Sequence, residues 1–297
     1  MNHWNSQGRE PNVAPSAALL LGLACGPSTS PDAQGDAGTG MDLPSDSASS
    51  DESGEGAEFD CPGARWVEGN LEINDETDLE ALRDVGGVDG WLSIASTTRL
   101  TDLEFLSCLE VVSQNVSVFR NDGLESLVGL ERLRSIGQGI EDPAAQLTIG
   151  ENASLRDVSA LASLRELRAI GVDGNASLTG LDLPAIERLD LLAIGECMNY
   201  GDDLDEMPLE RIGNLPRLVH LRHLTVQGQA ELTSLAPIPE LARDGGLGLE
   251  SAFLRANTAL PQSEIDELVD AAGIEPLVCA YAPDQPEGCN EPCVIGE

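Results

Sequence analysis

Cysteine is the residue type of this chain most able to form covalent links within a fold. Setting Cys25 aside from the seven cysteines leaves six, and an even number is typical of disulfide bonds in an oxidising compartment. We expect one bridge among the last three, where the loops are short, and a second between Cys61 and Cys108. Cys197 is then a candidate for an unpaired thiol. The six are Cys61, Cys108, Cys197, Cys279, Cys289 and Cys293.

Signatures of an active site are missing from the sequence. It has no GxSxG or HExxH motif and no glycine-rich phosphate loop. A zinc site is disfavoured as well, because no CxxC pair occurs and the histidines His3, His220 and His223 are poorly placed for one. We therefore expect neither a metal ion nor a cofactor.

The densest group of acidic residues outside the N-terminal region lies at positions 201–206, with the sequence GDDLDE. Calcium prefers several oxygen ligands of this kind. The segment nevertheless matches neither an EF-hand loop nor the glycine-rich nonapeptide of calcium-binding β-rolls. We expect a solvated loop here, and calcium binding is the alternative.

The charge of the chain limits its partners. It carries 52 acidic against 16 basic residues, a net charge of -36, and every basic residue is an arginine. Nucleic acid is excluded as a natural partner, because attraction to phosphates needs a basic surface. Direct adsorption to anionic lipid is disfavoured for the same reason.

A short apolar run precedes Cys25: residues 17–24 read AALLLGLA. The run is too short to span a bilayer but fits the core of a signal peptide covering residues 1–25. Its end resembles a bacterial lipobox, although Gly22 and Leu23 depart from the residues that this motif prefers. The resemblance implies that Cys25 carries a lipid, which would be the only contact with a membrane. We expect an exported protein, held at the bacterial outer membrane or cell surface as a lipoprotein or simply secreted.

Residues 26–60 have the composition of a linker. They are rich in Gly, Ser, Asp and Pro and contain almost no large apolar side chain. Such a segment cannot bury a core, so we expect a disordered acidic linker that holds the folded part away from a membrane.

A repeat organises the rest of the chain. Each unit has two apolar residues separated by one position, and in most units a leucine follows six residues after the second. The spacing is constant while the unit length varies, which predicts a solenoid with insertions in its return loops. An asparagine also stands three residues after the pair in four units, where its amide could bond the turn backbone. The pairs are Leu71/Ile73, Leu92/Ile94, Val116/Val118, Leu147/Ile149, Ile170/Val172, Leu192/Ile194, Leu224/Val226 and Ala252/Leu254, and the asparagines are Asn121, Asn152, Asn175 and Asn257.

Residues 167–175, LRAIGVDGN, resemble a leucine-rich repeat. The longer step to the next leucine, together with the opening segment 61–73, is more similar to the receptor L-domain, a short right-handed β-helix of receptor ectodomains. This resemblance covers about residues 61–260. It implies a repeat solenoid of mainly parallel β structure, a right-handed β-helix of leucine-rich-repeat or receptor L-domain type.

The C-terminal region is expected to close the solenoid. Residues 263–272 (SEIDELVDAA) place Ile265, Leu268 and Val269 on one helix face, with Ser263 as N-cap and Gly273 as the terminator. We expect a capping helix here, which completes a solenoid domain over residues 61–275. Residues 276–297 are then a Cys-rich tail of irregular structure.

Side chains alternate between the two faces of a strand, so the residue between each apolar pair points outward. These outward positions are small and weakly polar, as at Ser117, Thr148 and Thr225, with Trp91, Phe119 and His223 beside them. A flat stacked surface with a few aromatic anchors suits the binding of a protein or a glycan. The alternative is that the face only contacts solvent and the aromatics cover neighbouring loops.

The sequence therefore favours a non-catalytic, cell-surface or secreted binding module that recognises a protein or glycan ligand through its exposed parallel strands. Two alternatives remain: a structural protein of the envelope or matrix that associates through its ends, and a carbohydrate-active β-helix enzyme. For the enzyme, paired carboxylates would be needed, and their spacing is set only by the fold.

Overall fold

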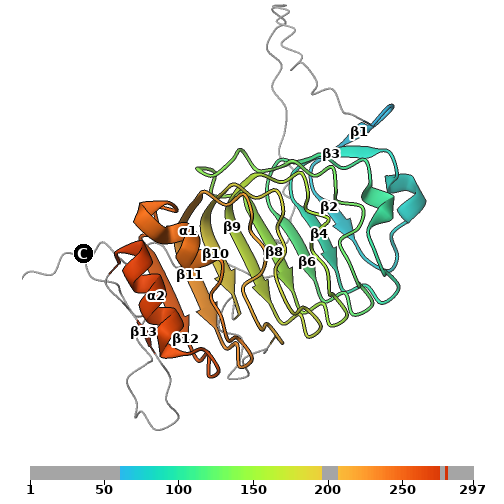
Figure 1. Cartoon of the computed structure of the whole chain (residues 1–297). Coiled ribbons are helices and arrows are strands. Elements are labelled where there is room, and N and C mark those ends of the chain that lie inside the picture. The colour runs from blue at the N-terminus through green and yellow to red at the C-terminus, as the bar shows by residue number, and fades with distance from the viewer. Residues whose placement is uncertain (1–60, 196–206, 275–277, 280–297) are drawn as a thin grey trace, which may run out of the picture.

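Nine parallel strands lying side by side form the main sheet of the protein, as the computed structural model shows (Figure 1). The structure describes residues 61–195, 207–274 and 278–279. Each coil of the chain contributes one strand, so the order along the sheet follows the sequence. The strands are β2 (Leu71–Ile73), β4 (Leu92–Ala95), β6 (Val116–Phe119), β8 (Gln146–Gly150), β9 (Glu166–Asp173), β10 (Arg188–Ile194), β11 (His220–Gln227), β12 (Ser251–Arg255) and β13 (Val278–Cys279).

The register of this sheet confirms the predicted repeat. The first apolar residue of each pair lies opposite the first apolar residue of the next pair, without a break from β2 to β12. The mainly parallel solenoid is therefore the fold of the described chain. The matched residues are Leu71, Leu92, Val116, Leu147, Ile170, Leu192, Leu224 and Ala252.

The leucines that follow each strand form columns through the interior. Five of them are at most 8% exposed, and together with the strand residues they belong to one hydrophobic core. All five lie in loops, outside helices and strands. The equivalent Leu79 begins the short 3-10 helix η1 (Leu79–Leu82), and a second 3-10 helix, η2 (Glu104–Leu106), follows Leu100. Burying such side chains contributes roughly 1.5–3 kcal/mol each. The five are Leu100, Leu124, Leu155, Leu178 and Leu232.

A second sheet, which the sequence analysis missed, lies on another side of the first coils. It is parallel and four-stranded, and its inward residues Val85, Val88, Val112 and Ile136 are at most 1% exposed. The coils of the N-terminal half therefore have two walls of β structure around one core. The strands are β1 (Arg65–Glu68), β3 (Val85–Asp89), β5 (Val111–Val112) and β7 (Ser135–Ile136).

Buried asparagines bond one coil to the next where the chain leaves the main sheet. The side chain of Asn152 donates to the carbonyl of Val118 at 2.9 Å, and its oxygen accepts from the backbone N–H of Asn121 at 3.0 Å. Asn175 accepts from Asn152 in the same way, at 3.1 Å from the backbone N–H. Thr97 and Gln229, both at most 1% exposed, occupy the equivalent positions of other coils. This asparagine ladder confirms the predicted role of the repeated amide.

The residue before each ladder position adopts a left-handed backbone in several coils. Its φ lies between 51° and 66° in six of them, although only two of the six are glycines. A left-handed conformation costs a side-chain-bearing residue roughly 1–2 kcal/mol. The stacking of the coils therefore imposes the turn on whichever residue stands there. The six are Ser96, Arg120, Glu151, Gly174, Gly228 and Ala256.

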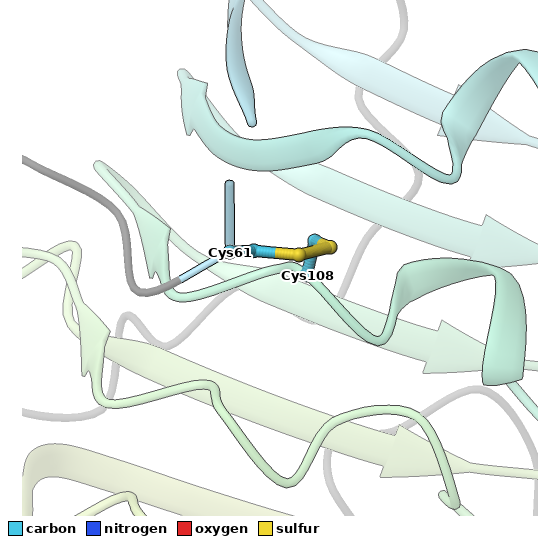
Figure 2. The surroundings of a disulfide bond; sticks show 2 residues. All are labelled: Cys61 and Cys108. Carbon is cyan, nitrogen blue, oxygen red and sulfur yellow. A yellow bond between two sulfur atoms is a disulfide. The ribbon is translucent and has the colours of Figure 1, made fainter. Parts of the chain in front are cut away.

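A disulfide bond holds the start of the solenoid. Cys61 is linked to Cys108, with their Cα atoms 5.5 Å apart, so the residues before β1 are attached to the coil between η2 and β5 (Figure 2). This pairing is the one expected from the sequence. Cys25, Cys197, Cys289 and Cys293 lie outside the described residues, and of Cys279 only the backbone in β13 is described.

Helices gather at the C-terminal end, where α1 (Ile238–Ala242), η3 (Arg243–Gly245) and α2 (Gln262–Ala272) contact one another (Figure 1). Ile265 and Leu268 of α2 are buried in the common core, as expected for a capping helix, and Gly273 ends it with a φ of 66°.

Two predictions about the C-terminal region are wrong. Helix α2 starts at Gln262, so Pro261 stands at the N-cap position instead of Ser263, and no side chain caps the helix there. The carboxylate of Glu264 instead accepts from the backbone N–H of Leu235 at 2.8 Å, which bonds the helix to the preceding coil. Residues 278–279, expected in an irregular tail, form β13 and pair with β12.

We expect Asn152→Ala to lower the free energy of unfolding by about 3 kcal/mol. The change removes the partner of the Val118 carbonyl and of the Asn121 N–H, and each buried polar group left unpaired costs roughly 1–3 kcal/mol. Urea unfolding measures the loss. Asn115→Ala, at an exposed asparagine, is the matched control and should change stability by less than about 0.5 kcal/mol. Equal losses in the two variants would contradict the structural role of the ladder.

Candidate functional site

The outer face of the main sheet carries a row of residues along its middle, most of them with small side chains. Successive members lie opposite one another across the strands, and all but Glu72 are buried or partly exposed. Because neighbouring strands are ~4.8 Å apart, the row is regular and leaves the strand backbones close to the surface. We call it the central row: Glu72, Ser93, Ser117, Thr148, Gly171, Ala193, Thr225 and Phe253.

The predicted hydroxyl residues are only partly brought together. Ser117 and Thr148 are direct neighbours on β6 and β8. Thr225 lies on β11, three strands away from Thr148, which corresponds to about 14 Å. Phe253 is the neighbour of Thr225 on β12 and was not singled out from the sequence. The strand that carries it has the weakest apolar pair of the repeat, which is why its outward residue was overlooked.

Phe119 lies flat at one border of the central row. A Cβ atom added to Gly150 on the neighbouring strand would come within 2.9 Å of its ring, so the ring covers that glycine. The guanidinium of Arg120 lies 4.8 Å from the ring centroid and contacts Glu151 at 2.6 Å. Such a cation–π contact holds the ring in place. Phe119 is thus a fixed, partly exposed apolar surface on the sheet.

Trp91 lies at the opposite border. Its backbone N–H donates to the side chain of Asn70 at 3.2 Å, and its carbonyl accepts from the N–H of Leu71 at 2.9 Å. Trp91 precedes β4 and Phe119 ends β6, so the two are about 13 Å apart along the strand direction. They therefore flank the central row and do not form one aromatic cluster.

His223 has a partner that the sequence analysis missed. Its Nδ1 lies 2.8 Å from the hydroxyl oxygen of Ser251 on the neighbouring strand. Burial lowers the pKa of His223 below its usual value, an effect that Asp190 and Glu250 oppose and that Arg222 and Arg168 reinforce. The imidazole is therefore neutral at pH 7, and it is fixed by a hydrogen bond to a neutral hydroxyl.

A row of alternating charges runs beside His223. Three of these charges, Arg168, Asp190 and Arg222, stand on the neighbouring strands β9, β10 and β11, and Glu250 directly precedes β12. Each lies two residues before the first apolar residue of its pair. Arg222 lies 2.8 Å from Asp190 and 3.5 Å from Glu250. The sequence shows that each of these residues precedes its apolar pair by the same number of positions. Because the coils differ in length, it does not show that the residues are neighbours. Asp190 and Glu250 share one guanidinium, so they do not face each other across an open site.

Two hollows of the described surface lie away from this face. One of about 460 Å³ is formed by η3 and α2, with Arg243, Asp266 and Asp270 in its lining. Another of about 330 Å³ lies at the turn after β2 and includes Asp75 and Arg99. None of the six residues predicted to bind a ligand lines either hollow.

Metal and membrane features can be assessed for the described residues alone. In that part of the chain no three His, Cys, Asp or Glu side chains gather into a metal site, and no helix is both long and apolar enough to cross a membrane. The acidic segment 201–206, for which calcium binding is the alternative to a solvated loop, lies outside the described residues, as does the proposed signal peptide.

We expect the stability of the protein to fall less on acidification when His223 is replaced by glutamine. Because the pKa of His223 is lowered in the folded state, its contribution is complete above its unfolded pKa and is lost as the pH falls through about 6.5. Thermal unfolding at about pH 7.5 and about pH 5.5 measures the difference. Ser251→Ala keeps the buried imidazole and should retain the wild-type pH dependence. Parallel curves for wild type and His223→Gln would contradict the burial of this group.

Comparison with known proteins assigns no relative to this chain. No protein-family model, no curated protein and no solved structure matches it. The arrangement of the central row and its borders is therefore interpreted from its own geometry.

Proposed function

We propose that this chain is a non-catalytic binding module that recognises a protein or glycan ligand through the outer face of its nine-stranded sheet. The observation that carries the proposal is the central row, in which eight residues lie in register across eight strands and six of them have small side chains. A ligand laid across the strands could contact the row at every step, with Trp91, Phe119 and His223 as larger contacts at its borders.

The rigidity of the face supports this proposal. Strand register, the asparagine ladder and the buried leucine columns fix the backbone below the row, and Phe119 and His223 are held by neighbouring side chains. A preformed surface loses little conformational entropy on binding, so that more of the contact energy appears as affinity. Recognition then needs no moving lid and no covalent step.

The proposed setting is outside the cytoplasm. The bond between Cys61 and Cys108 supports an oxidising compartment. Lipid attachment at Cys25, secretion as its alternative, and kinship with receptor L-domains belong to the same proposal and rest on the sequence patterns alone.

A structural role is the second candidate, because β2 and β1 are the terminal strands of the two sheets within the described chain. An unpaired strand edge can add a strand from another molecule. For a carbohydrate-active enzyme, by contrast, the shared ion pair of Asp190 and Glu250 with Arg222 offers no open pair of carboxylates.

The test is a glycan array that displays neutral and acidic glycans, probed with the full chain. We expect Trp91→Ala and Phe119→Ala each to lower the affinity for a bound glycan by roughly tenfold, because truncating an aromatic anchor typically costs more than about 1 kcal/mol. Val128→Ala, at an exposed valine outside the main sheet, is the control and should bind as the wild type does. Unchanged binding in both aromatic variants would show that the ligand contacts another face.

A further inference from the structure

Arginines without an ion-pair partner are unevenly distributed over the described chain. Most arginines there have a carboxylate within 4.0 Å, as expected when acidic residues outnumber basic ones by 52 to 16. Two of the exceptions lie in loops, and three lie on strands of the main sheet. Within the described residues the exceptions are Arg132 and Arg156 in loops and Arg168, Arg188 and Arg255 on strands.

Arg168 and Arg188 lie on adjacent strands, β9 and β10, close to where these strands begin. Arg188 stands between Glu166 and His220 in the sheet register, with no carboxylate in ion-pair distance within the described chain. Arg168 is next to Asp190, but the carboxylate of Asp190 is engaged by Arg222 at 2.8 Å. Within the described chain neither guanidinium therefore has a carboxylate of its own, and both stand at the beginning of the strands that carry the central row.

The beginnings of these strands carry one more arginine than carboxylates, in a chain that is otherwise strongly acidic. Arg165 and Arg217 share the single carboxylate of Glu187, at 2.8 and 3.9 Å. Five arginines at the start of β9, β10 and β11 are thus matched by only four carboxylates, Glu166, Glu187, Asp190 and Glu250, whereas the whole chain carries a net charge of -36. We call this surface the arginine patch: Arg165, Arg168, Arg188, Arg217 and Arg222.

We propose that the arginine patch binds an acidic polysaccharide, with Arg168 and Arg188 as the guanidiniums that take the carboxylates of uronate sugars. The inference rests on the proposed function and names the class of ligand. A guanidinium pairs with a carboxylate through two parallel hydrogen bonds, and an arginine without a competing carboxylate is the best placed to do so.

The shape of the face favours a thin polymer over an acidic protein. Strands lie ~4.8 Å apart, and a sugar unit of an extended chain advances by a similar length, so each sugar would meet an equivalent position. The neutral donors and acceptors of His223, Ser251 and Thr225 lie beside the patch for hydroxyl groups. A bulky acidic protein would also bring its charge close to the acidic surface around the patch, where repulsion acts over roughly 8 Å.

The experiment measures the affinity of the full chain for polygalacturonate and for its methyl ester, which is the same sugar chain without the charges. We expect binding of the acid form, with the ester at least tenfold weaker and with a steep loss of affinity between about 50 and about 300 mM salt. The double substitution Arg168→Gln with Arg188→Gln should weaken binding at least tenfold. Arg132→Gln with Arg156→Gln removes the same charge away from the main sheet and should leave the affinity unchanged, and thermal unfolding verifies that both variants are folded.

Several results would overturn the inference: no binding of polygalacturonate, equal binding of its ester, or equal losses in the two double variants. Tighter binding of poly-glutamate than of polygalacturonate would assign the patch to an acidic peptide instead. The proposed function is tested separately. Trp91→Ala and Phe119→Ala could weaken the binding of a glycan while the double substitution of Arg168 and Arg188 leaves it unchanged. That result would support the sheet face as the binding surface and refute only the role of the arginine patch.

Discussion

Backbone hydrogen bonding between successive parallel strands, in one unbroken register, is the constraint on which the rest of this structure depends. A single coil cannot bury both of its flat sides, so each is stabilised by the coils above and below it. The register places equivalent leucines in columns and brings Asn121, Asn152 and Asn175 within hydrogen-bond distance of one another. The same register imposes a left-handed backbone on side-chain-bearing residues such as Glu151 and Ala256. The preference of these residues for another backbone conformation is overridden, because that conformation would separate two coils.

The outer face inherits its regularity from this stacking. Inward residues are selected for the core, and the outward residues that alternate with them are free to vary in size and charge. In the N-terminal half the border positions hold Trp91 and Phe119, whereas the C-terminal half holds the charged row and the pair of His223 with Ser251. One fold therefore presents two surfaces of different chemistry along a single sheet.

The sequence was sufficient to predict the main sheet apart from β13, since a two-residue alternation followed by a leucine at fixed distance marks most coils. The asparagine ladder was predicted for the same reason, whereas Thr97 and Gln229 were not, because their side chains differ from asparagine. The second sheet was missed because strands such as Val111–Val112 are too short to show a period. Contacts between coils, such as that of His223 with Ser251, could not be found by spacing along the chain, since the return loops differ in length. The N-cap at Ser263 was predicted wrongly, because Glu264 bonds to the neighbouring coil and the helix starts earlier.

Distances between spin labels along the central row test the stacked register most directly. Labels carried by unnatural amino acids avoid the seven native cysteines. Ser93 and Thr225 are separated by five strand steps and Ser93 and Phe253 by six, which predicts separations of about 24 and about 29 Å by electron paramagnetic resonance. If the coils are stacked in register, the second distance should exceed the first by about one strand spacing. Broad distributions, or a shorter distance for the pair that lies further apart in the sheet order, would contradict the solenoid itself.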